Sequence, residues 1–461
     1  ANLPLSSLGR GRYGRMFRNL RPFSPTDESL RALADSMGPY PIPAISASTA
    51  PPAAAAAIQP GENPDLAAGY TYLGQFIDHD ITFDPVSSLE RRNDPDALVS
   101  FRTPRFDLDS LYGSGPADSP WLYDQEDPAK LLVGHNGGPD DEAEDLPRNQ
   151  QGRALVGDPR NDVHVIISQL TLAFIRFHNA VVDHLRGQFV ADAELFDEAQ
   201  RLARWHYQWV VIEDYVRPLV GPESVDRVLV TDSSTGARRA DLRFFHWKQE
   251  PFMPVEFSAA AFRFGHSQVR ATYILNASLD PKHIFLPSFD PAPLEHLGGF
   301  RRLPRGWKID WDLFFAVDGS SPQLSRRIDT KVTGPIAQLP PVLDRTRRPL
   351  ALLDLLRGKA LGLPSGEAVA GAMGTAPVGA PVSQATRTPL WYYLLREAET
   401  TTEGRRLGPT AATIVAEVFV GLLVGDPASF LRMAPTWEPT LPSAEPGRFT
   451  IVDLLRFAGV A

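Results

Sequence analysis

The sequence contains no cysteine, and this absence excludes several kinds of site at once. Its 461 residues form no disulfide and offer no thiolate to an iron–sulfur cluster or to cysteine-ligated zinc. An excess of positive charge is also missing, because 46 Lys and Arg residues face 55 Asp and Glu residues, for a formal net charge of −9. The composition therefore gives no electrostatic reason to expect nucleic acid or an anionic membrane as a partner.

Long apolar runs are scarce as well. We find no stretch of about 20 apolar residues that would span a membrane, and residues 1–20 lack the apolar core of a signal peptide. We therefore expect a soluble protein without a membrane span. The compartment stays open between cytoplasm and export, because proteins of both kinds can lack cysteine. The oligomeric state is equally open.

Apolar periodicity predicts long helices and little β structure. Residues 162–187 are apolar all round, which indicates burial, with Asp162 as the cap and Gly187 at the end of the predicted helix. A second predicted helix, residues 191–217, ends before Pro218, and a third, residues 409–424, carries Pro409 in its first turn. The predicted helices are residues 162–187, 191–217 and 409–424.

The domain organisation follows from the same pattern. Alternating strand patterns are rare, no repeat of fixed period occurs, and no linker marks a clear boundary. We predict a mainly α-helical chain with long irregular connections, folded as one domain over residues 1–461. Residues 1–64 are expected to wrap around a catalytic core of residues 65–461.

Two histidines have neighbours that suggest chemistry. If residues 72–82 are helical, Gln75, Asp78 and His79 share one face, whereas Asp80 is rotated by about 100° and points elsewhere. One turn could then serve an acid–base histidine and, behind it, a site for a hard cation. A helix cap with a surface cluster is the simpler alternative.

The second histidine is His266, directly after Gly265. The glycine permits close approach by something flat or bulky, although a helix with a buried histidine explains the segment equally well. A hydrolase with Ser267 as nucleophile is a rival interpretation. It is disfavoured because Val269 replaces the closing glycine of the nucleophile elbow and no buried strand precedes it.

A loop with alternating oxygen ligands lies over residues 103–114. Thr103, Asp107 and Asp109 could bind Ca²⁺, with an ordinary acidic turn as the alternative. Arg160 stands just before a helix start, where the helix dipole does not favour a positive charge. A specific task for Arg160 is therefore plausible, although a surface arginine is the default.

Taken together and in this order, these segments resemble the animal-type haem peroxidases of the peroxidase–cyclooxygenase superfamily, and specifically their bacterial branch. The resemblance covers roughly residues 10–460. Its motifs are GQFIDHD (74–80), TPRFDLDSLYG (103–113), GDPRND (157–162), FHN (177–179), FRFGH (262–266), DLLRGKALGLPSG (354–366) and LGPTAATIVAEVFVGLL (407–423).

The resemblance implies haem b as cofactor and a role for each matching residue. His266 matches the proximal ligand of the haem iron, His79 the distal acid–base group, Gln75 its neighbour, and Arg160 the distal arginine that stabilises developing negative charge. Arg263 and Arg357 match positions near the haem. The implied calcium ligands are Asp80, Thr103, Asp107, Asp109 and the carbonyl of Arg105.

Three positions depart from the family pattern. Val163 stands where a Glu often forms an ester with the haem, so only Asp78 could form such a bond. Asp354 replaces the Asn expected beside the proximal histidine, which should lower the potential of the iron and weaken oxidation of chloride. Asp109 replaces a common Ser and should tighten calcium binding.

The resemblance implies an enzyme, a peroxidase that reduces hydrogen peroxide and oxidises phenols, aromatic amines, iodide, bromide or thiocyanate. One alternative is a fatty-acid dioxygenase. It is disfavoured because Arg263 occupies the position of the radical-forming tyrosine, three residues before the proximal histidine. A catalytically silent haem-binding scaffold is the other alternative, and it would have no need of Gln75, His79 and Arg160.

Overall fold

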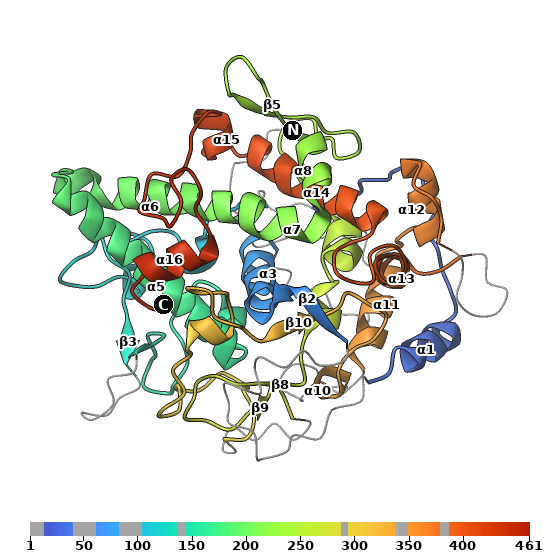
Figure 1. The fold of residues 1–461 in the computed structure, drawn as a ribbon, viewed down its shortest axis with the longest axis horizontal. Helices are drawn as coiled ribbons and strands as arrows, with labels where there is room; N and C mark the ends of the chain where they lie inside the picture. The colour runs from blue at the N-terminus through green and yellow to red at the C-terminus, as the bar shows by residue number, and fades with distance from the viewer. Residues whose placement is uncertain are drawn as a thin grey trace.

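Helices dominate the computed structural model (Figure 1), which describes residues 13–39, 61–82, 104–135, 144–286, 294–337, 339, 349–378 and 387–461. The predicted mainly α-helical class is confirmed. The α-helices are α1 (Asp27–Ser36), α3 (Ala68–Ile81), α4 (Asp109–Tyr112), α5 (Val165–Gly187), α6 (Asp192–Trp209), α7 (Arg217–Val220), α8 (Pro222–Val228), α9 (Gly265–Gln268), α10 (Gly334–Ala337), α11 (Leu350–Ala360), α12 (Gly366–Met373), α13 (Leu390–Thr401), α14 (Pro409–Gly425), α15 (Phe430–Met433) and α16 (Ile451–Phe457).

The strands are short and pair two at a time within the described residues. The parallel pair is β1 (Tyr13–Gly14) with β7 (Met253–Pro254). The antiparallel pairs are β2 (Glu62–Ala67) with β10 (Leu324–Arg326), β3 (Gly134–His135) with β4 (Glu144–Asp145), β5 (Leu229–Thr231) with β6 (Arg238–Ala240), and β8 (Thr272–Tyr273) with β9 (Lys282–His283).

Shorter helical turns of other types connect these elements. Two are π-helical segments that sit next to α-helices, where the wider turn changes the direction of the side chains that follow. The 3₁₀ turns are η3 (Pro120–Leu122), η4 (Pro159–Asp162) and η7 (Trp311–Leu313), and the π segments are η5 (Val210–Val216) and η6 (Phe257–Ala261).

The long helix α5 exists as predicted, but its start was predicted wrongly. It begins at Val165, and His164 is its cap, accepting the backbone N–H of Ile167 at 3.2 Å. Asp162 cannot cap it, because both carboxylate oxygens of Asp162 accept hydrogen bonds from the buried Arg148 guanidinium at 2.7 Å. A partner 14 residues earlier in the chain therefore decides where the helix begins.

The helix α5 is long and apolar enough to cross a membrane by length and composition. However, 83% of its most apolar window is buried inside the fold, as expected of a core helix. Helix α14 matches the predicted third helix, with Pro409 in its first turn.

The second predicted helix does not end before Pro218. Helix α6 passes through the π segment η5 into α7, which contains Pro218 and ends only before Gly221, where φ is +87°. Proline lacks an N–H and its ring crowds the preceding turn, so a widened turn just before it reduces the penalty. Gly221 then provides the left-handed backbone that stops the helix.

Helix α3 lies near the middle of the molecule (Figure 1), against α5 and η5. Phe76 stacks on Phe174 of α5 with 4.3 Å between ring centroids. Gly74 allows the approach to η5, because a Cβ there would overlap the hydroxyl of Tyr215. Aromatic packing and one small residue therefore hold α3 at a fixed depth in the core.

The N-terminal segment is tied to the core by a buried carboxylate. Glu256 accepts the backbone N–H groups of Met16 at 3.0 Å and Phe17 at 3.2 Å, just after the strand β1. The wrapping role of residues 1–64 stays a prediction, since residues 1–12 and 40–60 lie outside the described ranges.

Candidate active site

One cavity of about 250 Å³ brings together five of the predicted site residues. Helix α3 contributes Gln75, Asp78 and His79 to its wall, and the segment around α9 contributes Arg263 and His266. The remaining wall is largely apolar. The lining also includes Phe262, Phe264, Val269, Ile284, Phe285 and Leu350.

His79 enters this cavity from the buried side of α3. Its Nδ1 lies 2.8 Å from Oδ1 of Asn161, and an amide oxygen can only accept, so Nδ1 carries the proton. Burial, followed by the positive charge of Arg160, lowers the pKa of His79 to about 4. At neutral pH the imidazole is therefore uncharged, and Nε2 has a free lone pair.

Arg160 lies behind His79, and it is not among the described residues that line the cavity. Its guanidinium forms an ion pair with the fully buried Asp158 at 2.8 Å and donates to the backbone carbonyls of His79 at 3.1 Å and of Thr82. Asp78 lies 3.9 Å away. A cation beside the last carbonyls of α3 interacts favourably with the negative end of the helix dipole and fixes the turn that carries His79.

Asp78 faces the same cavity as His79. Its Oδ1 accepts a hydrogen bond from the Thr82 hydroxyl at 3.1 Å. Val163, at the family's other ester position, also lines the cavity and offers no carboxylate.

His266 stands on the short helix α9, and a carboxylate orients it. Its Nδ1 lies 2.6 Å from Oδ2 of Asp354, so the Nδ1–H donates and Nε2 is left to face the cavity. Arg263 donates to the other oxygen, Oδ1, at 3.1 Å. Asp354 is only 2% exposed. Burial would raise the pKa of Asp354, but the charges of His266, Arg263 and Arg357 outweigh it and hold the pKa below its usual range.

The carboxylate of Asp354 has more partners than the sequence predicts. The sequence predicts an anionic partner for His266, and the structure adds a guanidinium on its second oxygen. Arg263 is held in turn by the Ser258 carbonyl at 2.9 Å, and its own carbonyl accepts the Trp391 indole N–H at 3.2 Å. Arg357 acts on Asp354 through its charge.

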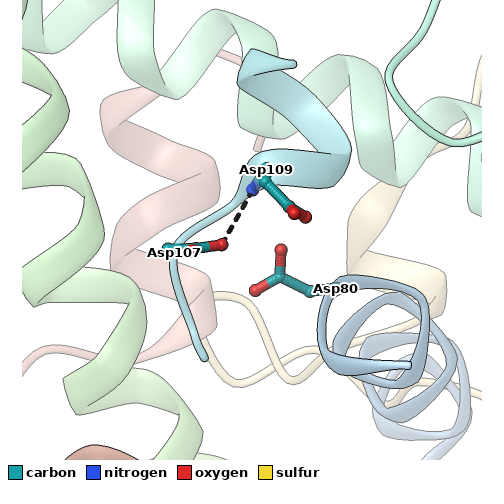
Figure 2. Close-up of side chains that lie close together, drawn as sticks. All are labelled: Asp80, Asp107 and Asp109. Atoms are coloured by element: carbon teal, nitrogen blue, oxygen red, sulfur yellow. Dashed lines mark hydrogen bonds between the residues drawn. The ribbon is translucent and has the colours of Figure 1, made fainter. Parts of the chain in front are cut away.

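On the opposite side of α3, three carboxylates converge. The ligand atoms of Asp80, Asp107 and Asp109 all lie within 4.8 Å of one another (Figure 2). Asp80 is fully buried and accepts the backbone N–H of Leu108 at 3.3 Å. Leu108 has φ of +57°, which turns the loop so that both of its aspartates face Asp80. Oxygen ligands of this kind suit a hard cation such as Ca²⁺.

Two other predicted calcium ligands stay predictions. Thr103 lies outside the described residues. The prediction for Arg105 concerns its backbone carbonyl, and its guanidinium lies 3.9 Å from Asp426.

Two functional candidates escaped the sequence analysis. Asn161 is part of the GDPRND motif, but only the folded chain shows that it orients His79. His164 lines the cavity, and its Nε2 lies 2.8 Å from Oε1 of Gln75, which stands 89 positions earlier in the chain. The proximity of His164 to the arginine motif was the only sequence signal. Ser267, the rival nucleophile, is buried, donates to the Phe264 carbonyl and follows a π-helical segment rather than a strand.

Comparison with known proteins identifies the family. The sequence model of the animal haem peroxidase family matches residues 87–378. This range exceeds half of the chain, and the chain therefore belongs to the animal haem peroxidase family, whose cofactor is haem.

Curated relatives match only in part. Chorion peroxidase of Drosophila melanogaster is 26% identical over 127 residues, which are 27% of this chain and 15% of the relative. Dual oxidase of the same organism is 25% identical over 228 residues, 46% of this chain and 13% of the relative. The chain therefore aligns with less than one sixth of the length of these curated relatives.

Solved structures share the fold over most of the chain. Peroxidase A of Dictyostelium discoideum superposes with a TM-score of 0.59 and 14% identity, covering 92% of this chain and 89% of that one. A fatty acid alpha-dioxygenase of Arabidopsis thaliana gives 0.59 and 15%, with coverage of 91% and 74%. At such identities the likeness shows the fold alone.

The cavity fits a haem on three observations. His79 from α3 and His266 from α9 both line it, each with Nδ1 hydrogen-bonded to a side-chain oxygen. Most of the other lining residues are apolar, which suits a porphyrin. At Gly265, next to His266, a Cβ would meet nothing within 4 Å, which leaves room for a flat group above the helix.

Proposed function

We propose that this protein is a haem peroxidase that reduces hydrogen peroxide and oxidises small donors such as phenols, aromatic amines, iodide, bromide or thiocyanate. The observation that carries the proposal is the pairing of His79 and His266 in one cavity. One is a neutral base with a free Nε2, and the other is a histidine hydrogen-bonded to a carboxylate.

His266 would bind the haem iron through Nε2, and haem supplies the redox chemistry that splits the peroxide bond. The hydrogen bond from Nδ1–H to Asp354 strengthens His266 as a donor. The positive charge of Arg263 offsets part of the negative charge of Asp354, so the effect on His266 is smaller than that of an unpaired carboxylate. We propose that the remaining charge makes this enzyme a weaker oxidant of chloride than relatives with Asn at this position.

His79 would move the protons. Its Nε2 would accept a proton from one oxygen of hydrogen peroxide, hold it, and return it to the other oxygen. The low pKa of His79 keeps Nε2 unprotonated before peroxide arrives. Arg160 stays cationic behind it and holds the backbone of His79 in place. For Arg160 we thus add a positioning role to the charge-stabilising role that the resemblance implies.

Two further features belong to the proposal. The cluster of Asp80, Asp107 and Asp109 would bind calcium, and because Asp80 is the residue after His79, the ion would also fix the base. Asp78 would form a single ester with the haem, since it faces the cavity and Val163 cannot.

A fatty-acid dioxygenase is the alternative that the shared fold keeps open. Arg263 argues against it, since the radical tyrosine is replaced by a guanidinium that is bound to Asp354. Oxygen uptake with linoleate in the absence of peroxide would favour the dioxygenase.

The test is a comparison of three variants loaded with hemin. We expect His266→Ala to lose the Soret band of the haem–histidine complex. His79→Ala should keep that band but lose peroxide-dependent oxidation of a phenol by about 10² to 10⁴-fold, the usual contribution of a positioned acid–base group. The matched control is His184→Ala on α5, whose imidazole is hydrogen-bonded to Gln188, packs on Phe457 and does not line the cavity, so it should change neither readout.

Two outcomes would contradict the proposal. Normal haem binding by His266→Ala would remove the proximal assignment. Full peroxide turnover by His79→Ala would remove the distal one.

A further inference from the structure

His164 is a third histidine in the cavity, and both of its nitrogens have defined partners. It is the cap residue of α5 and only 2% exposed. Its Nδ1 lies 3.2 Å from the backbone nitrogen of Ile167, and its Nε2 lies 2.8 Å from Gln75 Oε1.

The first contact determines the tautomer of His164. The backbone N–H of Ile167 can only donate, so Nδ1 must be the unprotonated nitrogen. Burial, and then the charge that His79 carries when it is protonated, lower the pKa of His164 to about 3, so the ring is neutral and carries its one proton on Nε2. The backbone of a helix start therefore makes Nε2 a donor.

The second contact determines the orientation of Gln75. Since Nε2–H donates, the atom of Gln75 facing His164 must be the carbonyl oxygen, and the amide NH₂ is turned away from His164. Gln75 and His79 are four residues apart on α3, so their side chains are neighbours on one helix face. Both line the cavity.

We propose that His164 is a positioning residue that fixes the amide of Gln75 so that the cavity presents N–H donors from Gln75 beside the acceptor Nε2 of His79. Hydrogen peroxide matches this pair, because one O–H can donate to His79 while the other oxygen accepts from Gln75. The inference rests on the proposed function and adds a residue that acts through Gln75.

Two substitutions separate the two contacts of His164. Asn places its carbonyl oxygen near the position of Nδ1 and is among the best helix caps, but its amide is too short to reach Gln75. Gln places its amide nitrogen near the position of Nε2 and can still donate to Gln75, but it is a poor cap. Each variant thus keeps one of the two contacts.

The probe is fluoride binding to the hemin-loaded ferric protein, read from the absorption spectrum. Fluoride has no proton and depends on N–H donors in the cavity. We expect His164→Asn to weaken fluoride binding by about fivefold, the effect of one ordinary hydrogen bond, and His164→Gln to restore most of it. The melting temperature should show the opposite order: both variants lose the ring contacts of His164 with Tyr72 and Phe285, and His164→Gln, which also loses the cap, should melt about 1 to 2 °C below His164→Asn.

The outcomes distinguish the inference from a purely structural role. If fluoride affinity followed the melting temperature, or if His164→Asn bound fluoride as tightly as the original protein, Gln75 would not depend on His164. Nitrogen NMR reads the tautomer of His164 without haem, and a proton on Nδ1 would overturn the inference. A protein that acquires no Soret band with hemin would instead refute the proposed function.

Discussion

Replacing Asp109 by Asn should stabilise the protein in a calcium chelator and reduce the stabilisation that calcium provides. Without a cation, the carboxylates of Asp80, Asp107 and Asp109 repel one another within 4.8 Å. Two unit charges at that distance repel by about 3 kcal/mol at an effective dielectric constant of about 20. Since Asp107 and Asp109 are half-buried and water screens them, about 1 kcal/mol for each pair is realistic.

The substitution removes two of the three repulsive pairs, so the gain in the free energy of unfolding is about 2 kcal/mol. For a chain of 461 residues the entropy of unfolding is about 1 kcal/mol per degree, and the melting temperature should rise by about 2 °C. Calcium at 100 times its Kd adds about 2.7 kcal/mol, or about 3 °C. If Asn weakens binding about 100-fold, the same calcium concentration adds less than about 1 °C.

The assay is scanning calorimetry of both proteins in chelator and in calcium. Asp118→Asn is the matched control, because Asp118 is exposed a few residues further along the chain. It should leave both melting temperatures unchanged. A lower melting temperature of Asp109→Asn in chelator would refute the repulsion, and an undiminished response to calcium would mean that Asp109 is not a ligand.

Asp354→Asn should keep an oxygen acceptor for His266 Nδ1–H but lose the negative charge, so the haem should be retained and the iron reduction potential should rise on the order of 60 mV. Spectroelectrochemical titration measures this shift, and an unchanged potential would contradict a tuning role of the carboxylate. Acid should destabilise the fold through His206, whose Nδ1–H donates to the Leu202 carbonyl while Nε2 accepts the N–H groups of Thr440 and Leu441. Burial lowers the pKa of His206 to about 4, whereas the unfolded chain takes up this proton near pH 6.5, so stability falls as the pH drops from about 6.5 to 4. Urea denaturation at several pH values should give a shallower slope for His206→Gln by about one proton, and an equal slope would contradict the assignment.

The sequence was most informative where one helix carries the whole pattern. The spacing of Gln75, Asp78 and His79 predicts a shared face, and the structure has all three on one wall of the cavity. The same periodicity predicts that Asp80 points elsewhere, and it lies in the acidic cluster. These relations depend only on the geometry of α3, which is why local reasoning was sufficient.

Contacts between distant segments were beyond such reasoning. The start of α5 was predicted wrongly because Asp162 binds Arg148, and no local pattern assigns that pair. His164 took the cap position and with it a hydrogen bond to Gln75. Likewise, no local pattern predicts that Arg160 pairs with Asp158 and donates to the carbonyl of His79 near the end of α3.

Helix α3 is shared by two sites that face away from each other. This arrangement restricts the insertions and deletions that the sequence of α3 can accept. A single residue inserted between Gln75 and His79 would rotate everything after it by about 100°. His79 would leave the cavity wall and Asp80 would leave the acidic cluster in the same event. Insertions and deletions should therefore be tolerated in the loops of this protein but not within this stretch.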